Sequence, residues 1–186
     1  MRSKRRSAPR HVRCRLAPRR SAPRPDTENP PERECWDAAL RFLASRPRSL
    51  RELRLKLGPR FGEPVTESII ERLAGMGLAD DAAFARYWLE NRERHRPRGA
   101  RALRSELGAK GIDRGAVEDA IATAHDEFAA ARTAAQARAR RILKADAREL
   151  ARRLHEHLQR RGFDWEAAEA AVREVLNERS AGDFGA

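Results

Sequence analysis

The sequence has few cysteines, few aromatic residues and no long apolar run. Its two cysteines, Cys14 and Cys35, are far apart and form no CxxC pair, so neither a disulfide framework nor a zinc site is expected. Isolated thiols are typical of a reducing compartment. No apolar segment is long enough to cross a bilayer, and the N-terminal residues include none of the apolar stretch typical of a secretion signal. We therefore expect a cytoplasmic protein without a membrane anchor or a bound metal.

Motifs of catalysis are also missing. The sequence contains no P-loop, HExxH, GxSxG or paired-carboxylate pattern on a recognisable scaffold. His155 and His157 are two residues apart, so on a helix their side chains would lie on different faces and make a poor metal pair. His95 lies among arginines and is expected to make a polar contact. We predict that the protein is not an enzyme and uses no cofactor.

Basic residues, by contrast, are abundant and unevenly distributed. The net charge is +12, of which residues 1–31 carry +8. This segment has few large aliphatic side chains and cannot offset the entropy of ordering, so we predict a disordered basic tail. Its composition also resembles an organellar transit peptide, and a misassigned start codon is a further alternative. The basic excess favours polyanions, either nucleic acid or an acidic protein surface.

The remaining residues predict nine short α-helices. Ser49 and Glu52 form a capping box, in which the Ser49 side chain caps the helix and the Glu52 side chain accepts the Ser49 amide. Asp80, Asp113 and Asp164 are further N-cap residues, and Asp81 adds negative charge to the positive end of a helix dipole. Helix ends are predicted at Ser45, Gly58-Pro59, Gly75-Met76-Gly77, the residues before Pro97, Gly111, Gly162 and Asn177.

A repeat of about fifty residues explains the rhythm of these helices. Paired leucines four residues apart recur at Leu53 and Leu57, Leu103 and Leu107, and Leu154 and Leu158, and each pair is followed by a glycine. We predict three tandem three-helix units, 32–79, 80–125 and 126–178, with a flexible C-terminus at 179–186. Units this small are expected to bury side chains against their neighbours, which gives an all-α, elongated and curved array.

A basic face crosses the break at Pro97, between two helices of the middle unit. Its candidate partner-binding and DNA-binding residues are Tyr87, Arg92, Arg94, Arg96, Arg98, Arg101, Arg104 and Lys110. Glu90 can pair with Arg94 at i, i+4 spacing, as on any solvated helix. The arginines at 96, 98, 101 and 104 lack an obvious local partner. We expect the Pro-Arg-Gly turn to point Arg98 and Arg101 outward, so that reversing both charges would leave the fold intact, and Gly99 to permit a close approach.

A second basic run lies between residues 138 and 161. Its candidate residues are Arg141, Lys144, Arg148, Arg152, Arg160 and Arg161. Solvated helix surface is an equally good interpretation of this run. Trp36, Trp88 and Trp165 could stack on bases, but Trp36 and Trp88 are at the spacing of core residues.

Five segments in the correct order resemble the RecX family of regulators of the RecA recombinase. They are SLREL, DDAAFARYWLENR, the RPRG turn, RALRSELGAKGI and RRGFDWEAAEAAV, and the resemblance covers residues 34–178 without the basic tail. It implies an all-helical modulator that lies in the groove of the RecA–single-strand DNA filament and suppresses filament extension, ATP hydrolysis and strand exchange. We expect a monomer that binds single-stranded and double-stranded DNA without sequence preference. The alternative is a free-standing helix-turn-helix DNA-binding regulator, because basic three-helix units also describe that class.

Deleting residues 1–31 is expected to leave the helix content and cooperative unfolding of the remaining chain unchanged, because the deleted residues lack apolar anchors. Non-specific DNA binding should weaken, most clearly at low salt, since ten basic side chains are removed. Thermal unfolding followed by circular dichroism and DNA titrations at low and high salt measure these effects. A large drop in Tm would mean instead that the tail packs on the body.

Overall fold

A computed structural model describes residues 30–142 and 145–182 of the chain, and all regular structure within these ranges is helical. The predicted disorder of residues 1–29 and the site residue Lys144 lie outside them. The described helices are α1 (Pro30–Leu43), α2 (Leu50–Phe61), α3 (Glu63–Gly75), α4 (Asp81–His95), α5 (Ala100–Ala109), α6 (Arg114–Ala124), α7 (Glu127–Ala139), α8 (Ala147–Arg160) and α9 (Trp165–Ser180).

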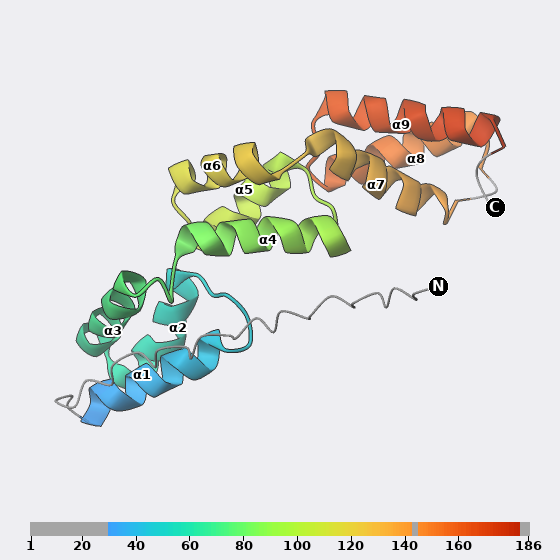
Figure 1. Ribbon diagram of the computed structural model, residues 1–186. Coiled ribbons are helices and arrows are strands. Elements are labelled where there is room, and N and C mark those ends of the chain that lie inside the picture. The colour runs from blue at the N-terminus through green and yellow to red at the C-terminus, as the bar shows by residue number, and fades with distance from the viewer. Residues whose placement is uncertain (1–29, 143–144, 183–186) are drawn as a thin grey trace, which may run out of the picture.

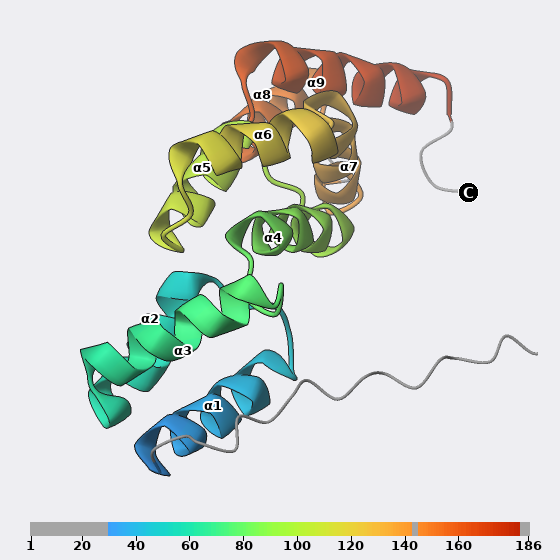
Figure 2. The ribbon, with the colours of Figure 1, turned by 60° about the vertical axis from the view of Figure 1, so that its left-hand side comes forward.

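The nine described helices form three bundles, α1–α3, α4–α6 and α7–α9, which follow one another in a bent row (Figures 1 and 2). Each bundle has a separate apolar core. The middle helix of each bundle supplies its repeated leucines, among them Leu53, Leu103 and Leu154, which are at most 1% exposed. The predicted all-α, elongated and curved array of three repeats is therefore confirmed.

The third bundle has a core of a different kind. The helix α7 buries only alanines, which are Ala130, Ala131, Ala134, Ala135 and Ala139. Small side chains let two helices approach closely, and α7 packs extensively against α9, where Val172 and Val175 are buried. An alanine-lined helix has little contrast between its faces, which explains why its boundaries are hard to predict from apolar periodicity.

Local capping residues begin the helices where the sequence predicts. Ser49 and Glu52 form the complete capping box at α2. The side chains of Asp80, Asp113 and Asp164 accept hydrogen bonds of 2.8, 2.8 and 2.7 Å from backbone amides of α4, α6 and α9. The predicted ends of α3, α5 and α8 are also confirmed, because each is followed by a glycine with positive φ, namely Gly77, Gly111 and Gly162.

Four predicted helix boundaries, one start and three ends, are wrong. The helix α1 begins at Pro30, inside the predicted tail, because a proline in the first turn lacks only an amide that the helix does not use. It also ends two residues earlier, at Leu43. The helix α2 continues through Pro59 to Phe61. The missing Pro59 amide would bond the carbonyl of Leu55, which lies on an exposed face where water can replace it. The helix α9 continues beyond Asn177 to Ser180.

Within the described ranges, no helix combines the length and the apolar character that crossing a bilayer requires.

A comparison of two leucines in α2 tests the packing of the array. Leu53→Ala should lower the free energy of unfolding by about 2–5 kcal/mol, the usual cost of emptying a buried leucine site. Leu53 is fully buried, whereas Leu55, two residues later on the same helix, is 67% exposed. Leu55→Ala should therefore change stability by less than about 0.5 kcal/mol. Chemical denaturation of both variants measures the difference, and equal losses would contradict the helix orientation.

Candidate functional site at the joints between bundles

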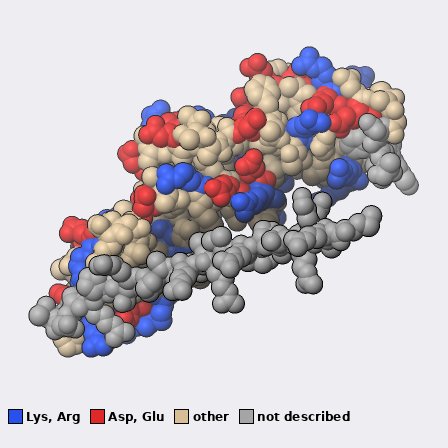
Figure 3. Space-filling view, in the orientation of Figure 1, with Lys and Arg blue, Asp and Glu red and all other residues tan. Residues whose placement is uncertain are grey.

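Acidic and basic side chains are interspersed over the face of the molecule drawn in Figure 3, so charge density alone does not mark a site. The informative places are the two contacts between successive bundles. We call the contact between the first and second bundles the first joint, and the contact between the second and third bundles the second joint.

Both joints have the same construction. The N-terminal turn of one bundle's middle helix meets the C-terminal end of the next bundle's middle helix. At the first joint, Arg51 Nη1 donates a hydrogen bond of 3.0 Å to the carbonyl of Ala109. At the second joint, Arg101 Nη2 donates one of 2.9 Å to the carbonyl of Gln159. The C-terminal carbonyls of a helix have no partner within it, so each arginine satisfies such a group in the neighbouring bundle.

A carboxylate accepts a backbone amide across each joint. The amide of Leu50 donates to Asp81 at 2.9 Å, and the amide of Ala100 donates to Glu127 at 2.7 Å. Asp81 and Glu127 are the first residues of α4 and α7. The sequence assigns Asp81 only to the dipole of its own helix, whereas the structure also gives it an acceptor role between bundles. These amides belong to the first turns of α2 and α5, which have no acceptor within their own helix.

The pKa values of these two carboxyl groups shift in opposite directions. Burial raises the pKa of Glu127, but hydrogen bonds from His125 and from the amides of Ala100 and Asp164 outweigh it and hold the pKa below its usual value. The pKa of Asp81 is raised, mainly by burial, and the single hydrogen bond from the Leu50 amide only partly offsets this effect. Glu127 therefore accepts more hydrogen bonds than Asp81 does. Because its pKa is lowered, it stabilises the joint fully at pH values above the ordinary glutamate pKa, and this stabilisation is lost as the pH falls through its lowered pKa.

The second joint is the tighter of the two. The Oγ of Ser49 donates to the Lys110 carbonyl at 2.8 Å, whereas at Gly99 the backbone amide itself donates to the Arg161 carbonyl at 3.1 Å. A Cβ atom on Gly99 would lie 2.3 Å from backbone atoms of Gly162. The close approach at Gly99 is made by the backbone of the third bundle.

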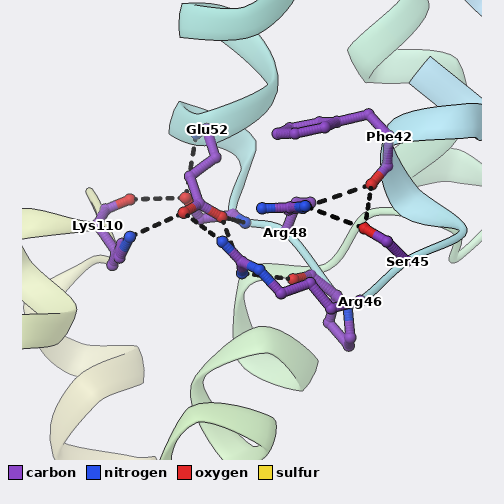
Figure 4. A network of polar contacts seen from close by, with 8 residues as sticks. Phe42, Ser45, Arg46, Arg48, Glu52 and Lys110 are labelled. Carbon is purple, nitrogen blue, oxygen red and sulfur yellow. Dashed lines mark hydrogen bonds and ion pairs between the residues drawn. The ribbon is translucent and has the colours of Figure 1, made fainter. Parts of the chain in front are cut away.

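At the first joint, Arg46, Arg48 and Lys110 each have a partner (Figure 4). Glu52 lies 3.1 Å from Arg46 and 2.8 Å from Lys110 of the second bundle. Burial raises the pKa of Glu52, but the hydrogen bonds from Lys110 and Arg46 outweigh it and lower the pKa below its usual value. Arg48 lies 4.0 Å from the centre of the Phe42 ring. The charges of Arg46 and Lys110 are thus compensated by Glu52.

At the second joint, four arginines gather with little compensation. Arg161 Nη1 donates a 2.9 Å hydrogen bond to the Pro97 carbonyl. Burial lowers the pKa of Arg161, and the nearby Arg98, Arg96 and Arg141 lower it further. Within the described ranges, the side chains of Arg96 and Arg141 are exposed and have no hydrogen-bond or ion-pair partner. We call Arg96, Arg98, Arg141 and Arg161 the second-joint cluster.

A histidine beside this cluster senses the same excess of positive charge. The pKa of His157 is lowered to about 4, first by burial and then by Arg161, Arg138, Arg160 and Arg141. This pKa lies well below the ordinary histidine value of about 6.5, so His157 is neutral at physiological pH. Positive charge therefore continues beyond the cluster along the C-terminal ends of α7 and α8, where Arg138 and Arg160 lie.

The arginines of the predicted basic face of the second bundle differ in their contacts. Arg92, Arg98, Arg101 and Arg104 have partners on other helices, which lie too far along the chain for local spacing to reveal. Glu106 accepts hydrogen bonds from Arg92 at 2.6 Å and from Trp88 at 2.8 Å. Glu118 binds Arg104 at 2.8 Å. Arg98 and Arg101 also make contacts of their own, Arg98 with Glu106 and Arg101 with the Gln159 carbonyl across the second joint, so the effect of reversing their charges on the fold stays a prediction.

The remaining predicted residues are distributed as follows. Arg94 lies 3.7 Å from Glu90, and Tyr87 is half-buried on the same helix. In the second basic run, Arg152 pairs with Glu149 at 2.9 Å and also with Glu156. Arg160 lies 3.8 Å from Glu156, and Arg148 is exposed. Much of this run is therefore solvated helix surface, and only Arg141 and Arg161 from it join Arg96 and Arg98.

The described residues bring no group of three His, Cys, Asp or Glu side chains together in a way that could hold a metal ion. What they define is a class of protein, an array of three-helix bundles whose joints position charged side chains.

The comparisons identify the family within this class. The chain matches three successive family descriptions, which are "RecX, first three-helix domain" over residues 35–73, the second three-helix domain over residues 80–121 and the third over residues 125–172. The chain belongs to the RecX family.

Similar proteins carry the name Regulatory protein RecX. The one from Mycobacterium avium (strain 104) is 35% identical over 165 residues, which cover 86% of this chain and 95% of the relative. The one from Prosthecochloris aestuarii (strain DSM 271 / SK 413) is 33% identical over 147 residues, which cover 77% and 95%. The crystal structure of RecX from Lactobacillus salivarius superposes with a TM-score of 0.67 at 22% identity over 78% of this chain and 96% of that chain, which shows the same fold.

Gly99→Ala should destabilise the second joint. The new methyl group would overlap the Gly162 backbone, and overpacking of this kind costs about 1–3 kcal/mol or more when backbone must move. Gly75→Ala is the matched control, because no heavy atom lies within 4 Å of its added Cβ. Hydrogen exchange measured by mass spectrometry should show faster exchange at the start of α5 and the end of α8 in the Gly99 variant alone. Equal protection in both variants would mean that the joint is looser than described.

Proposed function

We propose that this protein is a modulator of the RecA recombinase that binds the RecA–DNA filament and inhibits its extension, ATP hydrolysis and strand exchange. It acts as a monomer in the cytoplasm, without catalysis or a cofactor of its own. DNA of either strandedness is contacted without regard to sequence.

Membership of the RecX family is the observation that carries this proposal. The shape of the array supports it, because three bundles in a bent row offer a long surface to an extended partner. The second-joint cluster supports it as well, since uncompensated cations attract a polyanion and accelerate encounter with it. A filament of protein and DNA is both extended and negatively charged along its DNA.

The helix-turn-helix alternative has less support. A recognition helix places its N-terminal residues against base edges in the major groove. The N-terminal turns of α2 and α5 are instead docked on neighbouring bundles through Arg51 and Arg101. The third helices of the outer bundles have an acidic residue in the first turn, Glu63 in α3 and Glu166 in α9, which would be repelled by phosphates.

Added to RecA filaments on single-stranded DNA, the protein should lower the steady-state rate of ATP hydrolysis and of strand exchange. The extent should be the same on oligo-dT and on mixed-sequence strands, because no base is read. A coupled ATPase assay and a fluorescent strand-exchange assay measure this, with co-sedimentation to report binding.

The alternative function predicts a different result. A site-specific regulator should prefer particular duplexes over others by about 4–10 kcal/mol, and should leave RecA activity unchanged. Selection from a random duplex library would reveal such a preference.

A further inference from the structure

The two joints are built from matching segments, so they can be compared residue by residue. Arg46-Pro47-Arg48-Ser49 at the first joint corresponds to Arg96-Pro97-Arg98-Gly99 at the second, fifty residues later. Lys110-Gly111, after α5, corresponds to Arg161-Gly162, after α8. The cations Arg46 and Lys110 therefore have Arg96 and Arg161 as their counterparts.

The acid that compensates these cations exists at one joint only. Glu52 is the third residue after the N-cap Ser49, and it binds both Arg46 and Lys110. The equivalent position after Gly99 is Ala102, whose methyl group faces the backbone of Gly162. Arg96 and Arg161 thus occupy the places of a neutralised pair without the carboxylate that neutralises it.

Neighbouring acids do not take over this role. Glu106 lies 3.5 Å from Arg98 Nε but already accepts hydrogen bonds from Trp88 and Arg92. Among the described residues, the buried Nε of Arg98 has no hydrogen-bond acceptor, and neither has the buried Nε of Arg138. Arg141 adds a further exposed cation from the end of α7. The joint therefore contains both excess charge and unused donors.

We propose that the second-joint cluster, formed by Arg96, Arg98, Arg141 and Arg161 around the vacant acid position of Ala102, is a binding site for the phosphate groups of a nucleic-acid backbone. The identity of the polymer rests on the proposed function, whereas the site itself rests on the comparison of the joints. Guanidinium groups present paired N–H donors that match two phosphate oxygens. Successive phosphates along a strand supply the several negative charges that four arginines require, which a single carboxylate does not.

The position of the site has a structural consequence. Arg98 belongs to the second bundle and Arg161, which donates to the Pro97 carbonyl, to the third, so a phosphate bound by both would contact both bundles. Binding replaces repulsion among the arginines by attraction to a shared anion. A ligand that binds only the folded, joined state raises the Tm. Phosphate binding should therefore stabilise the joint as well as hold the nucleic acid.

The experiment measures phosphate binding directly, with no recombinase present. A fluorescently labelled oligo-dT reports backbone binding by anisotropy over a series of salt concentrations, and inorganic pyrophosphate reports phosphate binding by its effect on Tm. Arg96→Gln with Arg141→Gln removes two exposed members of the cluster. Arg41→Gln with Arg173→Gln is the control, because these exposed arginines of α1 and α9 give the same change in net charge.

In the cluster variant, the slope of log K against log salt should become shallower by about 1.4, the value for two lost contacts to a single strand. The pyrophosphate-induced rise in Tm should disappear. The control pair should retain the rise in Tm and most of the wild-type slope. Ala102→Glu, which supplies the acid of the first joint, should reproduce the loss seen in the cluster variant; if it does not fold, the glutamine pairs decide alone.

Equal losses in the cluster and control pairs would refute the site, since binding would then follow net charge. A rise in Tm with pyrophosphate but cluster-independent oligo-dT binding would refute the assignment to a nucleic-acid backbone, as would the capture of an acidic peptide in preference to both probes. Failure of the proposed function has a separate signature, in which oligo-dT binding depends on the cluster while the wild-type protein leaves RecA ATPase unchanged.

Discussion

The array depends on one interaction made twice, a helix-terminal amide donated to a carboxylate of the next bundle. The amides of Leu50 and Ala100 would have no acceptor in their own helices, and Asp81 and Glu127 provide one. Separating two bundles would expose these groups to water and leave small cores without their neighbours. The same contact fixes the direction in which the next bundle leaves, so the bend of the row follows from local helix chemistry repeated at each joint.

Repetition of the joint did not preserve its charge balance. At the first joint, a carboxylate at position 52 holds an arginine and a lysine from different bundles. At the second joint, Gly99 brings the backbones closer and Ala102 contributes no charge. Hydrogen bonds between backbones and the Arg101–Gln159 contact hold the second joint together despite repulsion among its arginines. The first joint thus uses its charged residues to hold two bundles together, whereas the second joint leaves its arginines available for the proposed phosphate site.

The sequence predicted helix caps and glycine ends well, because these depend on residues a few positions apart. It predicted the arginines of the candidate site but not their partners. Arg104 binds Glu118, fourteen residues away, and Arg101 binds a carbonyl fifty-eight residues away. Pairs this far apart in the sequence do not follow the helical spacing from which local partners can be predicted. Pro59 within α2 was missed for a similar reason, since its tolerance depends on the exposure of one face.

The sequence by itself determined the all-α class, the fifty-residue repeat and the positions of most helix ends, because capping, proline and glycine act within a turn of backbone. It also placed the basic residues along the chain. Only the tertiary structure decided which of them remain uncompensated. Lys110 and Arg161 occupy equivalent positions, yet one meets Glu52 and the other meets further arginines. Electrostatic compensation depends on distances between bundles, and those distances are set by how the joints pack.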